Sequence, residues 1–223
     1  MPRVIVFDLN ETLLDLSALD PAFARAFGDP MVRKRWFRQV LELFLTATVI
    51  DEYQSFDKLT EAALEMVAEQ ERVELKAADR TAVRKMMRKL PAFPDVRPAL
   101  ERLAGAGFRL AALTNSTEKT AKAQLENAGL DKLMERVLSA DAVQRYKPAR
   151  EAYRYAAMEL DVEPAELRLV AAHAWDVAGA LRAGCKAAFV ARPEKALNPK
   201  GAKPDIVGRD LGEVAEQIIA KDG

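Results

Sequence analysis

A carboxylate directly follows the first apolar run of the chain, where Asp8 comes after residues 4–7. An aspartate at the end of a strand can act as a nucleophile, bind a metal ion or cap a turn or helix, and an isolated one is most often a cap. The chemical interpretation of Asp8 therefore depends on whether other polar side chains come to the same place.

Four more polar side chains follow later apolar runs or precede a predicted helix, and they are Thr114, Asn115, Lys147 and Asp176. Hydroxyl and amide groups donate hydrogen bonds to carboxylate or phosphoryl oxygens. A lysine beside a buried aspartate keeps that aspartate ionised. Each signal also has a plainer interpretation, because Ser116 can cap a helix and a lone lysine is usually solvated. We predict that four of these side chains meet at one mouth of a sheet, namely Asp8, Thr114, Lys147 and Asp176.

Short apolar runs alternate with stretches of helical periodicity over most of the chain. Strands are predicted for residues 4–7, 108–113, 167–172, 187–190 and 206–207, and helices between them include residues 118–128 and 149–160. This alternation predicts an α/β fold with a Rossmann-like parallel sheet and helices on both of its faces. Ligands bind at the carboxyl ends of the strands in such sheets, which is where the polar side chains fall.

The alternation stops between residues 15 and 92, where helical patterns follow one another without a strand. In residues 55–70 the apolar side chains recur at three- and four-residue spacing, and Pro91-Ala92-Phe93-Pro94 then breaks the pattern. We therefore predict an inserted all-helical cap over residues 15–92 and a Rossmann-like core from residues 1–14 and 93–223. A cap inserted after the first strand would overhang the strand ends as a lid.

The composition excludes several functional classes. The 223 residues hold 34 basic and 34 acidic side chains, so the zero net charge gives no general attraction to nucleic acid or to an anionic membrane. One cysteine and one histidine cannot form a Cys/His zinc site, and one cysteine excludes an intrachain disulfide. No uncharged apolar stretch reaches the roughly 18 residues of a membrane span. We expect a cytoplasmic protein without nucleic-acid or membrane partners.

Several segments resemble a known family. The order and spacing of Asp8 and Lys147 are similar to those in the haloacid dehalogenase superfamily, whose members use an aspartate at the end of the first strand as a covalent nucleophile. Residues 138–148, with Tyr153 beyond them, and Ala174-Trp175-Asp176 more closely resemble the type II, or L-2-haloacid, dehalogenases. The resemblance covers essentially the whole chain.

The resemblance implies a role for each candidate residue. Asp8 would be the nucleophile, and Thr12 would help to hold its loop. Lys147 and Tyr153 would support the charge network, while Asp176 would anchor the lysine or the hydrolytic water. The residues expected to bind the substrate or the nucleophile are Leu9, Asn10, Gln39, Thr114, Asn115 and Trp175.

The implied reaction proceeds in two displacements. The Asp8 carboxylate attacks C2 of a short 2-haloalkanoate from the side opposite the halogen, which expels halide and leaves an ester with inversion at C2. Water then attacks the ester carbonyl and releases a 2-hydroxy acid. No metal and no cofactor are expected, and a homodimer is expected from the resemblance alone.

The resemblance also implies an arginine of the cap that receives the departing halide. Arg38, followed by Gln39 and apolar side chains, is the first candidate. Arg35, one helical turn earlier, is the alternative. Basic side chains are frequent in this part of the cap, and such clusters usually form a solvated helix face.

Two positions depart from the family pattern. Asn10 stands where the superfamily phosphatases carry a second aspartate as general acid and where the best known type II enzymes have tyrosine, and an amide cannot donate a catalytic proton. His173, preceded by Ala171 and Ala172, stands where relatives usually have serines and an asparagine. A lone histidine is ordinarily structural, but at this strand end His173 can hydrogen-bond the hydrolytic water or the substrate and titrate near neutral pH.

The sequence leaves three hypotheses for the function. The first is hydrolytic dehalogenation of short 2-haloacids through an ester on Asp8. The second is a magnesium-dependent small-molecule phosphatase of the same superfamily, which Asn10 disfavours. The third is a non-catalytic relative that binds a small anion, which the altered segment 171–173 keeps open.

Overall fold

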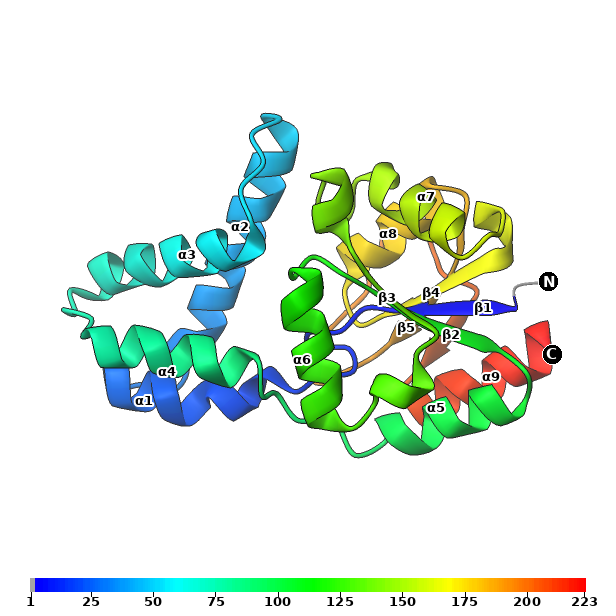
Figure 1. Ribbon diagram of the computed structural model, residues 1–223, viewed down its shortest axis with the longest axis horizontal. Coiled ribbons are helices and arrows are strands. Elements are labelled where there is room, and N and C mark those ends of the chain that lie inside the picture. The colour runs from blue at the N-terminus through cyan, green and yellow to red at the C-terminus, as the bar shows by residue number, and fades with distance from the viewer. Residues whose placement is uncertain (1–2) are drawn as a thin grey trace.

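Six parallel strands form one sheet in the computed structural model, which describes residues 3–223. Their order is β3-β2-β1-β4-β5-β6, so the first strand of the chain is central (Figure 1). The strands are β1 (Val4–Phe7), β2 (Arg109–Thr114), β3 (Arg136–Ser139), β4 (Leu167–Ala171), β5 (Lys186–Val190) and β6 (Ile206–Gly208). Phe7 at the end of β1 pairs with Ala112 of β2 and Val170 of β4, which brings these three strand ends together.

Both faces of the sheet are buried, as is usual for parallel strands. Along β1, Ile5 and Phe7 belong to one apolar cluster while Val4 and Val6 belong to another, because successive side chains of a strand alternate between the faces. The covering helices are α5 (Val96–Gly105), α6 (Glu118–Ala128) and α9 (Leu211–Asp222) on the first face, and α7 (Arg150–Glu159) and α8 (Ala174–Arg182) on the second. In Figure 1, α7 and α8 lie above the strands and α5 and α9 lie below them.

Local sequence signals place most of these elements. The predicted helix over residues 118–128 coincides with α6, which begins where the Thr117 side chain accepts a hydrogen bond from the Thr120 backbone N–H and ends at Gly129 with φ 66°. The sequence does not predict β3, a strand of 4 residues at the edge of the sheet. Pairing with β2, rather than an apolar run of its own, defines this strand.

Four α-helices between β1 and α5 form the cap, which lies beyond one end of the sheet in Figure 1. They are α1 (Asp20–Phe27), α2 (Val32–Val49), α3 (Phe56–Glu71) and α4 (Ala77–Met87). The two chain connections to the cap run side by side, since the Asp15 N–H donates to the Pro91 carbonyl at 2.9 Å and the Phe93 N–H donates to the Leu13 carbonyl at 3.0 Å. The predicted α/β class with a helical insertion is confirmed, and the division at residues 14 and 93 stays a prediction.

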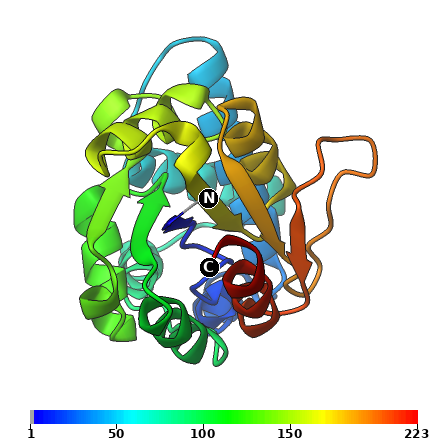
Figure 2. The ribbon, with the colours of Figure 1, turned by 90° about the vertical axis from the view of Figure 1, so that its right-hand side faces the viewer.

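Hydrogen bonds and ion pairs tie the cap to the core. Arg145 donates to the Thr48 carbonyl at 2.7 Å. A second link pairs Lys34 of α2 with Glu194 at 2.5 Å. Glu194 belongs to the segment between β5 and β6, which projects at one edge of the sheet in Figure 2. The cap is therefore held over the ends of β1 and β4 from two separate segments of the core.

Candidate active site

Asp8 is the first residue after β1, and its buried carboxylate contacts three side chains. Oδ1 accepts a hydrogen bond from Lys147 Nζ at 2.9 Å, and Oδ2 accepts one from the Thr12 hydroxyl at 2.7 Å. His173 Nδ1 lies 3.1 Å from Oδ2. The Ala172 backbone N–H donates to Thr12 Oγ1 at 2.9 Å, so the end of β4 fixes this hydroxyl. These partners hold the carboxylate in one orientation.

Lys147 is fully buried and uses all three of its ammonium protons. Nζ donates to Asp8 Oδ1, to Asp176 Oδ2 at 2.6 Å and to the Leu113 carbonyl at 2.8 Å. An ammonium group has three donors, so none is left unpaired. Asn115 positions the lysine, because its side chain accepts from the Lys147 N–H at 2.8 Å and donates to the Lys147 carbonyl at 3.2 Å.

Asp176 lies in the first turn of α8 and is anchored by Tyr153 of α7. The Tyr153 hydroxyl donates to Asp176 Oδ1 at 2.6 Å. The two helices approach closely at Gly179, where a Cβ would lie 2.5 Å from Tyr153 Oη. The contact between tyrosine and carboxylate therefore depends on the missing side chain at residue 179.

The electrostatics of the site favour the charged forms of Asp8 and Lys147. Burial opposes the charge on Asp8, but Lys147 and His173 outweigh it and hold the pKa of Asp8 well below its usual range. Burial likewise opposes the charge on Lys147, but Asp176 and Asp8 raise the pKa of its ammonium group. The pKa of Asp176 is raised by burial and by the Asp8 charge against the pull of Lys147. An ionised carboxylate is thus held, out of water, at the end of β1.

His173 lies between two carboxylates. Its Nδ1 faces Asp8, and its Nε2 lies 3.0 Å from Glu11 Oε2. Because an ionised carboxylate can only accept hydrogen bonds, both ring nitrogens carry protons in this arrangement. Burial lowers the pKa of the imidazole, but the hydrogen bonds to Asp8 and Glu11 outweigh it and raise the pKa above its ordinary value. Trp175 stacks on the ring with 5.0 Å between the centroids.

Most of the chain matches one protein family: residues 2–184 fit the model described as haloacid dehalogenase-like hydrolase. The chain belongs to this family. It is 32% identical over 187 residues to (S)-2-haloacid dehalogenase 4A of Burkholderia cepacia, which covers 82% of this chain and 80% of the relative. It is 29% identical over 214 residues to (S)-2-haloacid dehalogenase 2 of Pseudomonas sp. strain CBS-3, which covers 95% of this chain and 93% of the relative.

The fold also matches a solved structure. The L-2-haloacid dehalogenase from Xanthobacter autotrophicus aligns with a TM-score of 0.93 over 100% of both chains at 24% identity, a similarity that concerns the fold alone. With the curated relatives, it confirms the resemblance to the L-2-haloacid dehalogenases that the sequence segments indicate.

Arg38 is not brought to Asp8 in this hydrolase, contrary to the expectation from the sequence. Trp36 and Phe37 lie on the buried face of α2, whereas Arg38 is exposed. Successive residues of a helix point about 100° apart, so Arg38 is directed away from the packed face. Phe37 is the residue of α2 that approaches the site, with 6.5 Å between its ring centroid and that of His173.

The other candidates on α2 are also directed elsewhere. Arg35 is exposed and pairs with Glu71 at 2.9 Å. Gln39 lies against α3, where its Oε1 accepts a hydrogen bond from Gln70 at 3.4 Å. Within residues 3–223, the basic side chains that contact the Asp8 carboxylate are therefore Lys147 and His173, and neither is an arginine.

Three predicted residues lie beside the strand ends. Asn10 donates to Ser116 Oγ at 3.3 Å and accepts from Gln124 Nε2 at 3.2 Å. Thr114 Oγ1 accepts from the Ser116 N–H at 3.1 Å, and Leu9 is buried in the apolar core. None of these hydrogen bonds goes to the candidate nucleophile, so the structure groups these residues beside it without a direct polar contact.

The sequence does not predict two side chains of the site, Glu11 and Lys195. Glu11 contacts His173 and forms an ion pair with Lys195. Its φ of 61° lies in the left-handed region that favours glycine, a backbone feature that residue type alone does not reveal. Lys195 comes from the segment between β5 and β6, and no sequence spacing links it to the first strand.

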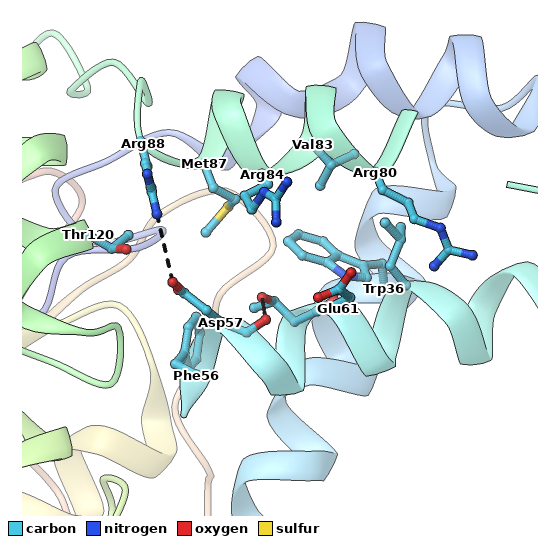
Figure 3. A pocket seen from close by; sticks show the side chains of 12 residues that line it. Trp36, Phe56, Asp57, Glu61, Arg80, Val83, Arg84, Met87, Arg88 and Thr120 are labelled. Atoms are coloured by element: carbon cyan, nitrogen blue, oxygen red, sulfur yellow. Dashed lines mark hydrogen bonds and ion pairs between the residues drawn. The ribbon is translucent and has the colours of Figure 1, made fainter. Parts of the chain in front are cut away.

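A cavity between the cap helices, with Thr120 of α6 also in its lining, is separate from this site. It lies between α2, α3 and α4, and its lining includes Trp36, Glu61 and Arg84 (Figure 3). None of the residues that contact Asp8 lines it. A second, open cleft of about 350 Å³ does reach the site, because Glu11 and Lys195 form part of its wall.

The described residues contain no helix long and apolar enough to cross a membrane. In the same part of the chain, no three histidine, cysteine, aspartate or glutamate side chains are grouped to hold a metal ion. The space between the Asp8 and Asp176 carboxylates is bridged by the Lys147 ammonium group, which pairs with both.

Proposed function

We propose that this hydrolase cleaves the carbon–halogen bond of short 2-haloalkanoic acids and produces 2-hydroxy acids. The observation that carries the proposal is the ionised Asp8 carboxylate, which is 5% exposed at the end of β1 and fixed by Thr12 and Lys147. The similarity to (S)-2-haloacid dehalogenases supports the same substrate class. No separate observation favours a phosphatase, and Asn10 offers no proton for a leaving alcohol.

The first step is a displacement at saturated carbon. The Asp8 carboxylate forms a bond to C2 as the bond between C2 and the halogen breaks, and the electron pair of that bond leaves with the halide. A positioned carboxylate with little water around it is an effective nucleophile for this step. Because halide is a stable anion, its departure needs neither a proton nor a cofactor.

The second step is hydrolysis of the ester. Water attacks Cγ of Asp8, and negative charge develops on an oxygen of that side chain. The Lys147 ammonium group beside Oδ1 stabilises this charge without having to move, which is the main requirement for electrostatic catalysis. Asp176 and Tyr153 keep the lysine in place through the contact between their side chains.

Trp175 is the candidate to receive the halide. Its Nε1 is buried and has no hydrogen-bond partner in residues 3–223, although the ring stacks directly on His173. Trp175→Phe keeps the stacked ring but removes the donor, so we expect kcat/KM for halide release to fall about 10- to 100-fold, from the roughly 1.5–3 kcal/mol of a hydrogen bond to a charged group. The exposed Arg38 gives the comparison, because Arg38→Ala should change halide release much less. An equal loss in both variants would contradict the assignment.

His173 is proposed to act in ester hydrolysis. Its Nδ1 lies beside Asp8, and the alanines before it leave no hydroxyl to place the hydrolytic water. His173→Ala should slow ester hydrolysis about a hundredfold or more while slowing ester formation much less, as expected when a general acid–base group is lost. Intact-protein mass spectrometry after single-turnover quenching would show the ester accumulating. Slow formation without accumulation would remove His173 from this step.

A panel of haloacids tests the proposed activity. Halide release from chloroacetate, bromoacetate, fluoroacetate and 2-chloropropionate is measured with and without a chelator, beside phosphate esters with magnesium. Release that resists the chelator supports dehalogenation. Magnesium-dependent turnover of phosphate esters would overturn it in favour of a phosphatase, and binding without any turnover would favour an anion-binding relative.

The proposed partner of the site is a small anionic substrate. The homodimer and the cytoplasmic location expected from the sequence stay predictions. Light scattering of the purified protein tests the homodimer directly, since a monomer mass would contradict it.

A further inference from the structure

The contact between Glu11 and His173 has no part in the two displacements described above. Glu11 Oε2 lies 3.0 Å from Nε2, and Asp8 Oδ2 lies 3.1 Å from Nδ1, so the ring joins two carboxylates through its two nitrogens. The imidazole is 5% exposed and is stacked by Trp175. Two hydrogen bonds and the stacked Trp175 ring therefore set the orientation of the imidazole. Glu11 is the partner that holds Nε2, the nitrogen that faces away from the nucleophile.

The backbone conformation at Glu11 is unusual for a residue with a side chain. A φ of 61° places it in the left-handed region, which glycine adopts freely and which a residue with a Cβ adopts at a cost. Such strained positions concentrate at functional sites. What a glutamate adds over a glycine here is the carboxylate, and that carboxylate contacts His173 and Lys195.

Lys195 pairs with the same oxygen of Glu11, Oε2, that faces His173 Nε2. The ion pair leaves the Lys195 side chain 23% exposed and the Glu11 side chain 17% exposed at the wall of the open cleft. Burial opposes the charge on Glu11, but His173 and Lys195 outweigh it and lower the pKa of Glu11. The carboxylate is therefore ionised while it faces the imidazole.

We propose that Glu11 is the positioning residue for His173 in ester hydrolysis and that Lys195 holds the Glu11 carboxylate in place for this contact. The proposal rests on the proposed dehalogenase function. A carboxylate that accepts the proton of one ring nitrogen fixes the tautomer and the orientation of the ring. Here Glu11 accepts a hydrogen bond from the Nε2–H group, and Nε2 keeps its proton. Nδ1 is therefore the nitrogen that gives or takes a proton at Asp8.

Esterification changes the charge that His173 faces. In the free enzyme the imidazolium lies between two negative carboxylates, but the ester on Asp8 is neutral. Losing one of two opposite charges favours the neutral ring. As halide leaves and water enters, Nδ1 gives its proton to that water and thence to solvent, while Nε2 keeps the proton that it donates to Glu11. His173 thereby becomes a base that points at the ester.

The proton count then closes over hydrolysis. The attacking water gives one proton to Nδ1 as its oxygen bonds to Cγ of Asp8. The bond between Cγ and the oxygen of the 2-hydroxy acid breaks, and the departing alkoxide takes the proton from Nδ1. Asp8 is left as a carboxylic acid, which returns its proton to Nδ1. The cycle consumes one haloacid and one water, and it yields one hydroxy acid, one halide and the proton lost after the first step.

The charged groups around the imidazole come from several parts of the core. The residue of α2 near the ring is the uncharged Phe37, whereas the charged cap residues Asp20, Arg33 and Lys34 line the open cleft beside Glu11. Lys147 and Asp176 act through Asp8, which they flank, and Lys195 acts through Glu11. The groups that contact the ring itself are Asp8 and Glu11.

A titration of His173 tests the positioning role without substrate. His173 is the only histidine of the chain, so the protein without an affinity tag gives one imidazole signal in NMR. We expect a midpoint above that of a free imidazole in the wild type, because Asp8 and Glu11 raise the pKa of the ring. Glu11→Gln should lower the midpoint by about one pH unit or more, and Lys195→Met should raise it. Glu194→Gln is the matched control, because Glu194 also has a positive φ of 64° and lines the same cleft but pairs with Lys34.

Single-turnover kinetics test the same role in the reaction. In Glu11→Gln, ester hydrolysis should slow at least about tenfold and its pH profile should shift to lower pH, whereas ester formation should change less than about threefold. Glu11→Gly is the second variant, since glycine suits the backbone and the protein should fold even if the glutamine variant does not. It should show the same hydrolysis defect, and Glu194→Gln should not.

The two levels of the proposal fail in different ways. If the wild type releases no halide, the proposed function is wrong. If the wild type turns over but Glu11→Gln and Glu11→Gly keep both the His173 midpoint and the rate of ester hydrolysis, only the positioning role of Glu11 is overturned. A lowered midpoint with ester accumulation in both variants supports it.

Discussion

Asp8→Asn is expected to abolish turnover, with kcat for halide release lowered about 10⁴- to 10⁶-fold, the range seen when an enzyme loses its nucleophile or the group that activates it. The amide keeps the size of the side chain, and its oxygen can still accept the hydrogen bond of Lys147, but its NH2 group cannot accept the one that Thr12 donates to Oδ2. It lacks the anionic oxygen that attacks C2. Halide release from 2-chloropropionate, measured on purified protein with the substitution verified by mass, checks the prediction.

The control for this variant is a second aspartate-to-asparagine change outside the site. Asp131 is exposed and lies in a short helical turn before β3, so Asp131→Asn should retain the wild-type rate. Circular dichroism should show both variants folded. A folded Asp8→Asn protein that releases halide at a rate near that of the wild type would remove Asp8 from its assigned role.

Lys147→Met is expected to lower the free energy of unfolding by about 3–5 kcal/mol, because removing one partner of a buried ion pair leaves the other charge uncompensated. Asp8 and Asp176 would then face each other in a buried site without the ammonium group that bridges them. One carboxyl group should take up a proton instead, so the stability deficit should shrink as the pH falls. Activity should be lost with the ionised nucleophile. Urea denaturation across a pH series measures the effect.

Two further variants isolate the charge from the general cost of substitution. Lys147→Met combined with Asp176→Asn should be more stable than the sum of the single changes predicts, since it removes one of the two stranded charges. Lys122→Met breaks only an exposed pair with Glu118 and should change stability by less than about 1 kcal/mol. Equal losses at Lys147 and Lys122 would show that the buried network contributes little.

The sequence predicts those residues of the site that come after a strand in the chain. Asp8 follows an apolar run, and Asp176 follows another, and parallel pairing must bring such ends to one edge of the sheet. The predicted convergence of Lys147 on both carboxylates is present in the structure. These features could be predicted because hydrophobic periodicity shows where each strand ends, and the residues after neighbouring parallel strands lie at the same edge of the sheet.

The features that the sequence does not predict depend on orientation or on distant segments. Arg38 and Phe37 are neighbours in the chain, and only the packing of α2 decides that the phenylalanine approaches His173 while the arginine is exposed. Lys195 reaches Glu11 from a segment 184 residues later in the chain. No local pattern could have paired them, because the ion pair forms only after the sheet places β1 and the end of β5 in one fold.

His173 lies where the sequence departs from the family pattern and where the structure brings two carboxylates together. The sequence identifies it as a departure from the family pattern, and the structure places its two nitrogens on Asp8 and Glu11. Among residues 3–223, the basic groups that contact Asp8 are Lys147 and His173, and both come from the core. Catalysis in such a site should depend on the charge state of one histidine.

The route of oxygen through the reaction tests the central claim most directly. One turnover is run with enzyme in excess over 2-chloropropionate in water labelled with heavy oxygen. If the ester forms on Asp8 and water attacks its Cγ, the first 2-hydroxy acid must be unlabelled and the label must appear in the peptide that contains Asp8. Label in the product of that first turnover, with an unlabelled Asp8 peptide, would show that water attacks the substrate directly and would contradict an ester on Asp8.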